Sequence, residues 1–182
     1  MTSAPAQRPI ELKVKEIGQL FQSLDPLPYR ERDLDAAVEE YVVGWAREMP
    51  REGDIEIVVR LPAAEAEREE AGHVAEAMRN YFAYRAEVTG WELRELFRVG
   101  RVSLATGLAV LGVCIVLARL MGNIVGGGYL GRFFVEGLII VGWVANWRPL
   151  EIFLYDWLPL VRRRRLYRRL ARAGVTLAAY DS

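Results

Sequence analysis

Three acids in the apolar C-terminal half of the chain, Glu136, Glu151 and Asp156, are the residues most suited to chemistry. Glu136 lies inside an apolar run, where an unpaired carboxylate is costly, so it is a candidate for proton or ion handling. Arg132 precedes it at the i, i+4 spacing that lets two side chains on one helix meet, and Arg119 ends the neighbouring apolar run. A structural ion pair is therefore the favoured interpretation, with proton or ion handling as the alternative.

Glu151 and Asp156 form a pair of acids that could act as acid and base at a membrane surface. Their five-residue separation places them about 140° apart around an α-helix, so we do not expect them to converge on one substrate atom. Salt bridges to partners are the favoured role. We predict no catalytic residue, and a lipid-acting membrane enzyme is the third and least favoured function.

Ligands for a metal or a nucleotide are few in this sequence. His73 is the only histidine and Cys114 the only cysteine, so neither a Cys/His metal cage nor an intrachain disulfide is expected. The glycines at 126–128 lack the following Lys and Ser/Thr of a phosphate loop, which favours a tight turn. The sequence predicts no metal and no cofactor.

The net charge of zero conceals two halves of opposite sign. Residues 1–101 carry 20 acidic and 14 basic side chains, whereas residues 102–182 carry 4 acidic and 10 basic. The basic side chains adjoin hydrophobic runs, where anionic lipid headgroups are the nearer counter-charge. Membrane lipid is therefore an expected partner, and nucleic acid is not.

Residues 102–147 are predicted to form a transmembrane helical hairpin. The first run, 102–121, is long enough to cross the hydrocarbon core, and the second, 130–147, crosses with some bilayer thinning. The glycine-rich link at 122–132 makes the two helices antiparallel neighbours. Glycines that could let the helices approach closely are Gly107, Gly112, Gly137 and Gly142.

Arginines mark one side of this hairpin. Arg94, Arg98 and Arg101 precede it and a basic block follows it, whereas only Arg119 and Arg132 lie between. This distribution predicts that both termini are cytoplasmic. The N-terminus also lacks the apolar segment of a secretory signal, which agrees with that orientation.

Residues 148–172 are predicted to form an amphipathic and basic segment at the membrane surface. We expect Pro149 to kink or restart the helix and Pro159 to separate an amphipathic helix from the basic block. For that block a topology signal is favoured over a specific lipid or partner site. The apolar face of the amphipathic helix comprises Leu150, Phe153, Leu154 and Trp157. The residues expected at the lipid interface are Trp147, Arg148, Trp157, Arg162, Arg163, Arg164, Arg165, Arg168 and Arg169.

Residues 1–62 are predicted to form a small cytoplasmic β-α-β domain. Period-two alternation indicates strands at 10–17 and 54–61, and the helix between them begins at an Asp33 cap. A third strand at 174–180 completes the sheet after the chain returns from the membrane. The apolar face of the helix comprises Leu34, Val38, Tyr41, Val42 and Trp45.

Residues 63–101 are predicted to form a helical stalk that begins after Pro62 and runs unbroken into the first apolar run. A coiled-coil-like seam on this stalk is an intrachain core in the favoured interpretation and a surface for self-association in the alternative. The seam comprises Val74, Ala77, Tyr81, Tyr84, Val88 and Trp91.

Three segments carry a resemblance to a known family: LFQSLDPLPYRERDLD, AMRNYFAYRAE and GWVANWRPLEIFLYDWLPLVRRRRLYRRL. They resemble small bacterial membrane proteins with two transmembrane helices. The resemblance implies a bacterial inner-membrane protein, and it implies no activity, cofactor or catalytic residue.

Together these patterns predict an α+β membrane protein in which a long helix joins the cytoplasmic domain to the hairpin. The leading function is a non-enzymatic adaptor or scaffold whose cytoplasmic domain binds a protein partner at the bilayer. The alternative is a subunit of an oligomeric channel or transporter, which requires a ring of hairpins because two helices cannot enclose a pathway.

Overall fold

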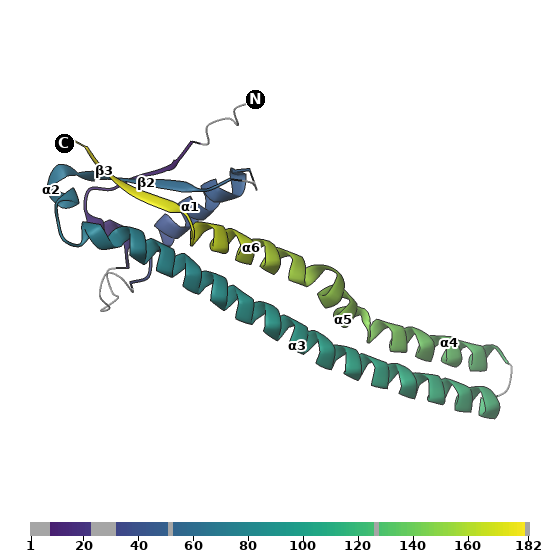
Figure 1. Ribbon diagram of the computed structural model, residues 1–182. Helices are drawn as coiled ribbons and strands as arrows, with labels where there is room; N and C mark the ends of the chain where they lie inside the picture. The colour runs from purple at the N-terminus through teal and green to yellow at the C-terminus, as the bar shows by residue number, and fades with distance from the viewer. Residues whose placement is uncertain (1–7, 23–31, 51–52, 126–127, 181–182) are drawn as a thin grey trace. The chain divides into compact units, whose positions relative to one another are not determined.

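The computed structural model describes residues 8–22, 32–50, 53–125 and 128–180. It shows an α+β chain with a small parallel sheet and a long helical hairpin (Figure 1). The chain divides into two compact units. The first, named the α+β unit, comprises residues 1–89 and 162–182, and the second, named the hairpin unit, comprises residues 90–161.

Three parallel strands form the sheet of the α+β unit: β1 (Ile10–Lys13), β2 (Glu56–Pro62) and β3 (Gly174–Tyr180), with β2 in the centre. The predicted third strand is therefore confirmed. Side chains alternate between the faces of a strand, and one face of β2 is fully buried. Its buried residues are Ile57, Val59 and Leu61.

Helix α1 (Ala36–Glu48) connects β1 to β2 and is capped by Asp35, whose side chain accepts a backbone N–H at 2.9 Å. The cap predicted at Asp33 is wrong. Leu34 pairs with Phe21 in an isolated antiparallel bridge, so the backbone remains extended through residue 34 and the helix can begin only after it.

The apolar face predicted for α1 is wrong at its two large aromatics. Val42, Val43 and Ala46 are buried, whereas Tyr41 is 44% exposed and Trp45 is 47% exposed. Each residue turns about 100° around a helix, so a buried stripe centred on Val42 and Ala46 carries positions 41 and 45 to its edge.

After β2, the short helix α2 (Ala63–Ala66) and a turn at 67–70 precede α3 (Ala71–Val125). The predicted unbroken passage of one helix into the first apolar run is confirmed. Its predicted start directly after Pro62 is wrong, because α2 ends at Ala66 and α3 begins only at Ala71.

The seam predicted on α3 is partly wrong. Tyr84 and Trp91 are each 52% exposed, and a row of buried residues in steps of four, Val74, Met78, Phe82 and Ala86, departs from the predicted seam. An ordinary α-helix has 3.6 residues per turn, so its buried stripe drifts away from a strict 3.5-residue seam. The buried residues of α3 within the α+β unit are Ala71, Val74, Ala77, Met78, Tyr81, Phe82, Ala86 and Thr89.

Helix α4 (Tyr129–Val144) ends three residues before the predicted end of the second run. A turn at 145–146 follows, and the chain is then helical through α5 (Trp147–Glu151), the π-helical η2 (Ile152–Asp156) and α6 (Trp157–Leu170). Of the two predicted alternatives, a kink or a restart of the helix at Pro149, the structure shows a restart, which begins at Trp147.

The break predicted at Pro159 is absent. Pro159 lies in the first turn of α6, directly after the π-helical turn η2. A missing backbone N–H is tolerated in a first turn, and the π turn shifts the local hydrogen-bond register. The amphipathic segment and the basic block are consequently parts of one helical stretch.

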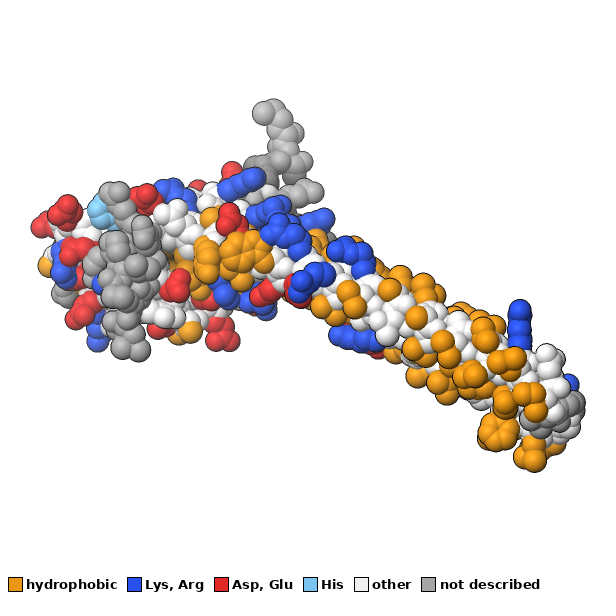
Figure 2. All heavy atoms as spheres, turned by 90° about the horizontal axis from the view of Figure 1, so that it is seen from below, with side chains coloured by type: hydrophobic (Ala, Val, Ile, Leu, Met, Phe, Trp, Pro, Cys, Tyr) orange, Lys and Arg blue, Asp and Glu red, His pale blue; other side chains and the backbone are white. Residues whose placement is uncertain are grey.

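Hydrophobic side chains cover much of the surface of the hairpin unit (Figure 2). The helical segments Ala71–Ile124 and Tyr129–Leu170 are each long and apolar enough to cross a membrane. Only 17% and 22% of their most apolar 18-residue windows are buried, so most of this apolar surface has no intrachain cover.

Candidate functional site

Glu39 on α1 lies at the centre of a hydrogen-bond network in the α+β unit. Tyr81 on α3 donates its hydroxyl to Oε2 of Glu39 at 2.7 Å, and Tyr167 on α6 donates to Oε1 at 2.8 Å. The Nη2 atom of Arg85 lies 3.1 Å from the same Oε1 atom. Arg163 donates to the Tyr167 hydroxyl at 3.1 Å, so the network joins α1, α3 and α6.

The charges in this network are mutually stabilising. Burial raises the pKa of Glu39, but hydrogen bonds from Tyr81 and Tyr167 and the charge of Arg85 outweigh it, so the net pKa lies below the ordinary value of 4.5. Burial and the neighbouring carboxylate raise the pKa of the Tyr81 phenol. At neutral pH the acid is ionised and the phenol is protonated, an arrangement that binds helices together rather than transferring protons.

Beside this network lies a cleft of about 390 Å³. Its lining combines the polar network with exposed residues of α1 and carries both signs of charge. The lining residues are Ala36, Glu39, Glu40, Val43, Gly44, Arg47, Arg85, Arg163 and Tyr167.

The sequence analysis missed Glu39. One local signal was available, since Glu39 follows Val38 and precedes the buried Val42 and Val43 on the same side of α1. A second signal was the i, i+4 pairing of a tyrosine and an arginine on each of the two other helices. Nothing local indicates that these three segments meet.

Tyr41 and Trp45 form an exposed aromatic pair on α1. Their ring centroids are 6.3 Å apart and their planes are inclined by 54°. Since about half of each side chain is exposed, the pair presents a preformed apolar surface on the α+β unit.

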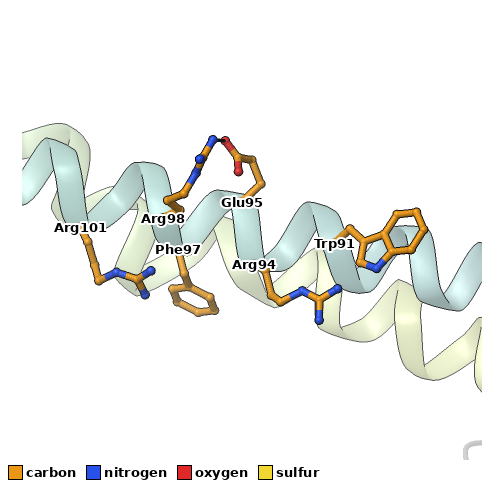
Figure 3. A pocket seen from close by; sticks show the side chains of 6 residues that line it. All are labelled: Trp91, Arg94, Glu95, Phe97, Arg98 and Arg101. Atoms are coloured by element: carbon orange, nitrogen blue, oxygen red, sulfur yellow. Dashed lines mark hydrogen bonds and ion pairs between the residues drawn. The ribbon is translucent and has the colours of Figure 1, made fainter.

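A second concave region, named the arginine hollow, lies on α3 within the hairpin unit and has a volume of about 710 Å³. Arg94 and Arg101 extend to the side of the helix on which Phe97 lies, whereas Arg98 bends towards Glu95 (Figure 3). Arg98 and Glu95 form an ion pair at 2.7 Å. The hollow is lined by Trp91, Arg94, Glu95, Phe97, Arg98 and Arg101.

Glu151 and Asp156 converge, contrary to the sequence prediction. Oε2 of Glu151 and Oδ2 of Asp156 each lie 3.2 Å from Nη1 of Arg148. The π-helical turn η2 lies between them, and its i→i+5 pattern brings residues five apart to nearly the same side. Trp147 also donates its indole N–H to Glu151, so the two acids and two of the predicted interface residues form one cluster.

The apolar face predicted for residues 148–158 is a prediction of lipid contact, and the exposure of its leucines does not contradict it. Ile152 is fully buried, whereas Leu150 is 42% and Leu154 is 55% exposed. Phe153 stacks on Phe97 with ring centroids 6.1 Å apart, and Trp157 donates its indole N–H to the Phe153 carbonyl oxygen. Ile152, which lies outside the predicted face, packs next to Gly100.

The arginines of the basic block have different environments. Arg163 packs on Tyr167, and Arg169 donates to the carbonyl oxygens of Pro50 at 2.9 Å and Gly53 at 3.2 Å. Nε of Arg164 is buried and has no hydrogen-bond partner among the residues that the structure describes. The exposed arginines between residues 162 and 169 are Arg162, Arg163, Arg165 and Arg168.

Glu136, Arg132 and Arg119 are all exposed on the hairpin unit. Within the described part of the chain, no ion pair of 4.0 Å or less joins Glu136 to either arginine. The structure therefore does not bring together the pair favoured by the sequence. Gly126 and Gly127 of the predicted turn lie outside the described residues.

Asn146, which the sequence analysis did not single out, is the buried polar residue of the hairpin unit's helix contact. Its Nδ2 donates to the carbonyl oxygens of Gly107 at 3.1 Å and Gly142 at 3.0 Å. A Cβ atom at Gly107 would lie 2.7 Å from Oδ1 of Asn146, and one at Gly142 would lie 2.6 Å from Leu111 Cδ1. Two of the four predicted glycines thus permit close packing, whereas a Cβ at Gly112 or Gly137 would meet nothing within 4 Å.

Among the described residues, no group of three or more His, Cys, Asp or Glu side chains could hold a metal ion. No family model, no curated protein and no solved structure matches this chain.

Proposed function

We propose that this chain is a membrane-anchored adaptor whose α+β unit binds a protein partner beside the bilayer. The exposed Tyr41–Trp45 pair is the observation that carries this proposal. Trp and Tyr dominate the binding energy of protein interfaces because each buries a large area with few rotatable bonds. Here the pair is already assembled at the edge of the buried stripe of α1, so little ordering is needed when a partner binds.

The hairpin unit supplies the anchor in this proposal. The helical segments that pass through it, Ala71–Ile124 and Tyr129–Leu170, are long and apolar enough to cross a membrane, and their apolar windows are mostly unburied, unlike the core helices of a soluble protein. The flanking arginines favour cytoplasmic termini by the positive-inside rule. A bacterial inner membrane is the location that the sequence resemblance implies.

The test is site-specific photo-crosslinking of the full chain in its native membrane. A photoreactive phenylalanine analogue at position 41 is expected to give one discrete adduct, and Trp45→Ala should reduce it at least fivefold. The matched control places the probe at Tyr84, an exposed aromatic on α3 of the same unit. If both positions give the same adducts, or if Trp45→Ala leaves the adduct unchanged, the proposed docking surface is wrong.

One observation favours a second candidate, the subunit of an oligomeric channel or transporter. Glu136 is exposed on the hairpin and unpaired with the nearest candidate arginines, so in hydrocarbon its carboxylate would need a partner from another copy. Native mass measurement in detergent tests this function, which requires a ring. A monomer or dimer excludes the ring, and unchanged ion flux in Glu136→Gln liposomes excludes a role for this acid.

A further inference from the structure

We propose that the arginine hollow is a binding site for the phosphate of an anionic phospholipid headgroup. The inference rests on the proposed membrane placement, since the hollow lies on α3 where the charged residues end and the first apolar run begins. It does not depend on the partner-binding role of Tyr41 and Trp45.

The charge of the hollow suits a phosphate. Its lining contains three arginines and one glutamate, which leaves a net charge of +2. Glu95 is occupied by Arg98 at 2.7 Å. Within the described residues Arg94 and Arg101 have no acidic partner, so their guanidinium groups retain the donors that bind phosphate oxygens in a bidentate manner.

The geometry holds these two guanidinium groups on one side of the helix. Arg94, Phe97 and Arg101 follow the i, i+3, i+7 spacing, and Figure 3 shows all three extending to the same side. The ring of Phe97 is half-buried against Phe153, so it forms a fixed apolar floor between the two cations. The two guanidinium groups therefore face the same side of α3, and a phosphate beside either group can accept hydrogen bonds from it.

Trp91 favours a lipid over a soluble phosphate compound as the source of this group. Its indole lines the hollow and is 52% exposed. Tryptophan is enriched at membrane–water interfaces because its apolar ring and polar N–H suit the headgroup region. Two arginines beside an interfacial tryptophan and an exposed apolar helix match the amphipathic chemistry of a phospholipid.

The experiment is a titration of the full chain, purified in a neutral detergent, with phosphatidylglycerol, followed by native mass spectrometry. Phosphatidylcholine is the lipid control. The double variant Arg94→Gln/Arg101→Gln is expected to weaken phosphatidylglycerol binding about tenfold. The matched control Arg79→Gln/Arg119→Gln removes the same charge from the same helix, yet both arginines lie outside the hollow, so a change below twofold is expected.

Equal weakening by the two double variants would overturn the site, because it would show general charge attraction. Unchanged binding in Arg94→Gln/Arg101→Gln would overturn it too. Displacement of phosphatidylglycerol by millimolar inorganic phosphate would overturn the lipid assignment. Crosslinking through position 41 should be unchanged in both variants, so failure here and failure of the adaptor function are distinguishable.

Discussion

The α+β unit and the hairpin unit secure their helices by different physical means. In the α+β unit, an ionised Glu39 accepts hydrogen bonds from side chains of two other helices. In the hairpin unit, the closest approaches occur at glycines, and Asn146 donates to two backbone carbonyl oxygens. The first unit therefore depends on charge and side-chain chemistry, whereas the second depends on the absence of side-chain volume.

The largest expected effect comes from removing the carboxylate of Glu39 in the α+β unit. Glu39→Ala leaves Tyr81, Tyr167 and Arg85 without their shared acceptor, and buried donors without an acceptor are costly. We expect a loss of about 3 kcal/mol in the free energy of opening of the α+β unit. Hydrogen exchange of α1 and β3 amides measures it. Glu40→Ala, at the exposed neighbouring position, should change the same quantity by less than about 0.5 kcal/mol.

The next largest effect is expected from adding side-chain volume at a glycine of the hairpin unit. A Cβ atom at Gly142 would lie 2.6 Å from Leu111 Cδ1 and 3.2 Å from Leu111 Cα, so Gly142→Ala must separate the two helices. We expect a destabilisation of about 2 kcal/mol, measured by unfolding in a denaturing detergent. Gly137→Ala is the control, because a Cβ there meets nothing within 4 Å. Equal behaviour of the two variants would show that glycine packing does not stabilise the hairpin.

A smaller effect is expected in the pH dependence of the stability of the α+β unit. The pKa of Glu39 is lower in the folded state than its ordinary value of 4.5, so its ionised form stabilises the fold above that pH. This stabilisation is expected to fall as the pH drops from about 4.5 through the folded-state pKa. Thermal unfolding of the wild type and Glu39→Gln between pH 3 and 7 checks it, and the variant should lose less stability on acidification.

The smallest expected effect concerns the cluster around Arg148. Its side chain is 63% exposed, and those of Glu151 and Asp156 are 42% and 33% exposed, so solvent weakens both ion pairs. Arg148→Ala should change stability by less than about 1 kcal/mol in the same detergent unfolding assay. A loss comparable with that of Gly142→Ala would mean that the hairpin unit also relies on charge.

Features encoded by local periodicity could be predicted from the sequence. Two-residue alternation predicted strands at 10–17 and 54–61, and the structure has strands at Ile10–Lys13 and Glu56–Pro62, so the first is shorter than predicted. The long helix agrees with the absence of proline between Ala71 and Val125. These signals do not require knowledge of what packs against them. Which residues of a helix form its buried stripe does depend on the elements that pack against it. The sequence therefore predicted Tyr41 and Trp45 to be buried, whereas both are exposed.

The candidate sites depend on contacts that local patterns do not contain. Glu39 meets Tyr167 across most of the chain, and no spacing rule connects them. The convergence of Glu151 and Asp156 depends on a π-helical turn, whereas the prediction assumed ordinary α-helical geometry throughout. The arginines of the hollow could be singled out from the sequence, because Arg94, Arg98 and Arg101 directly precede the first apolar run and so indicate its orientation.

The position of β3 has a consequence for the order of synthesis. The central strand pairs with β1 on one side and with β3 on the other, and β3 is made only after the whole hairpin has left the ribosome. Until then Val58 and its neighbours in β2 have one open edge, and the core lacks Tyr167 and Leu170. A chain that ends before β3 cannot complete this sheet, and its unpaired edge would expose it to aggregation and proteolysis.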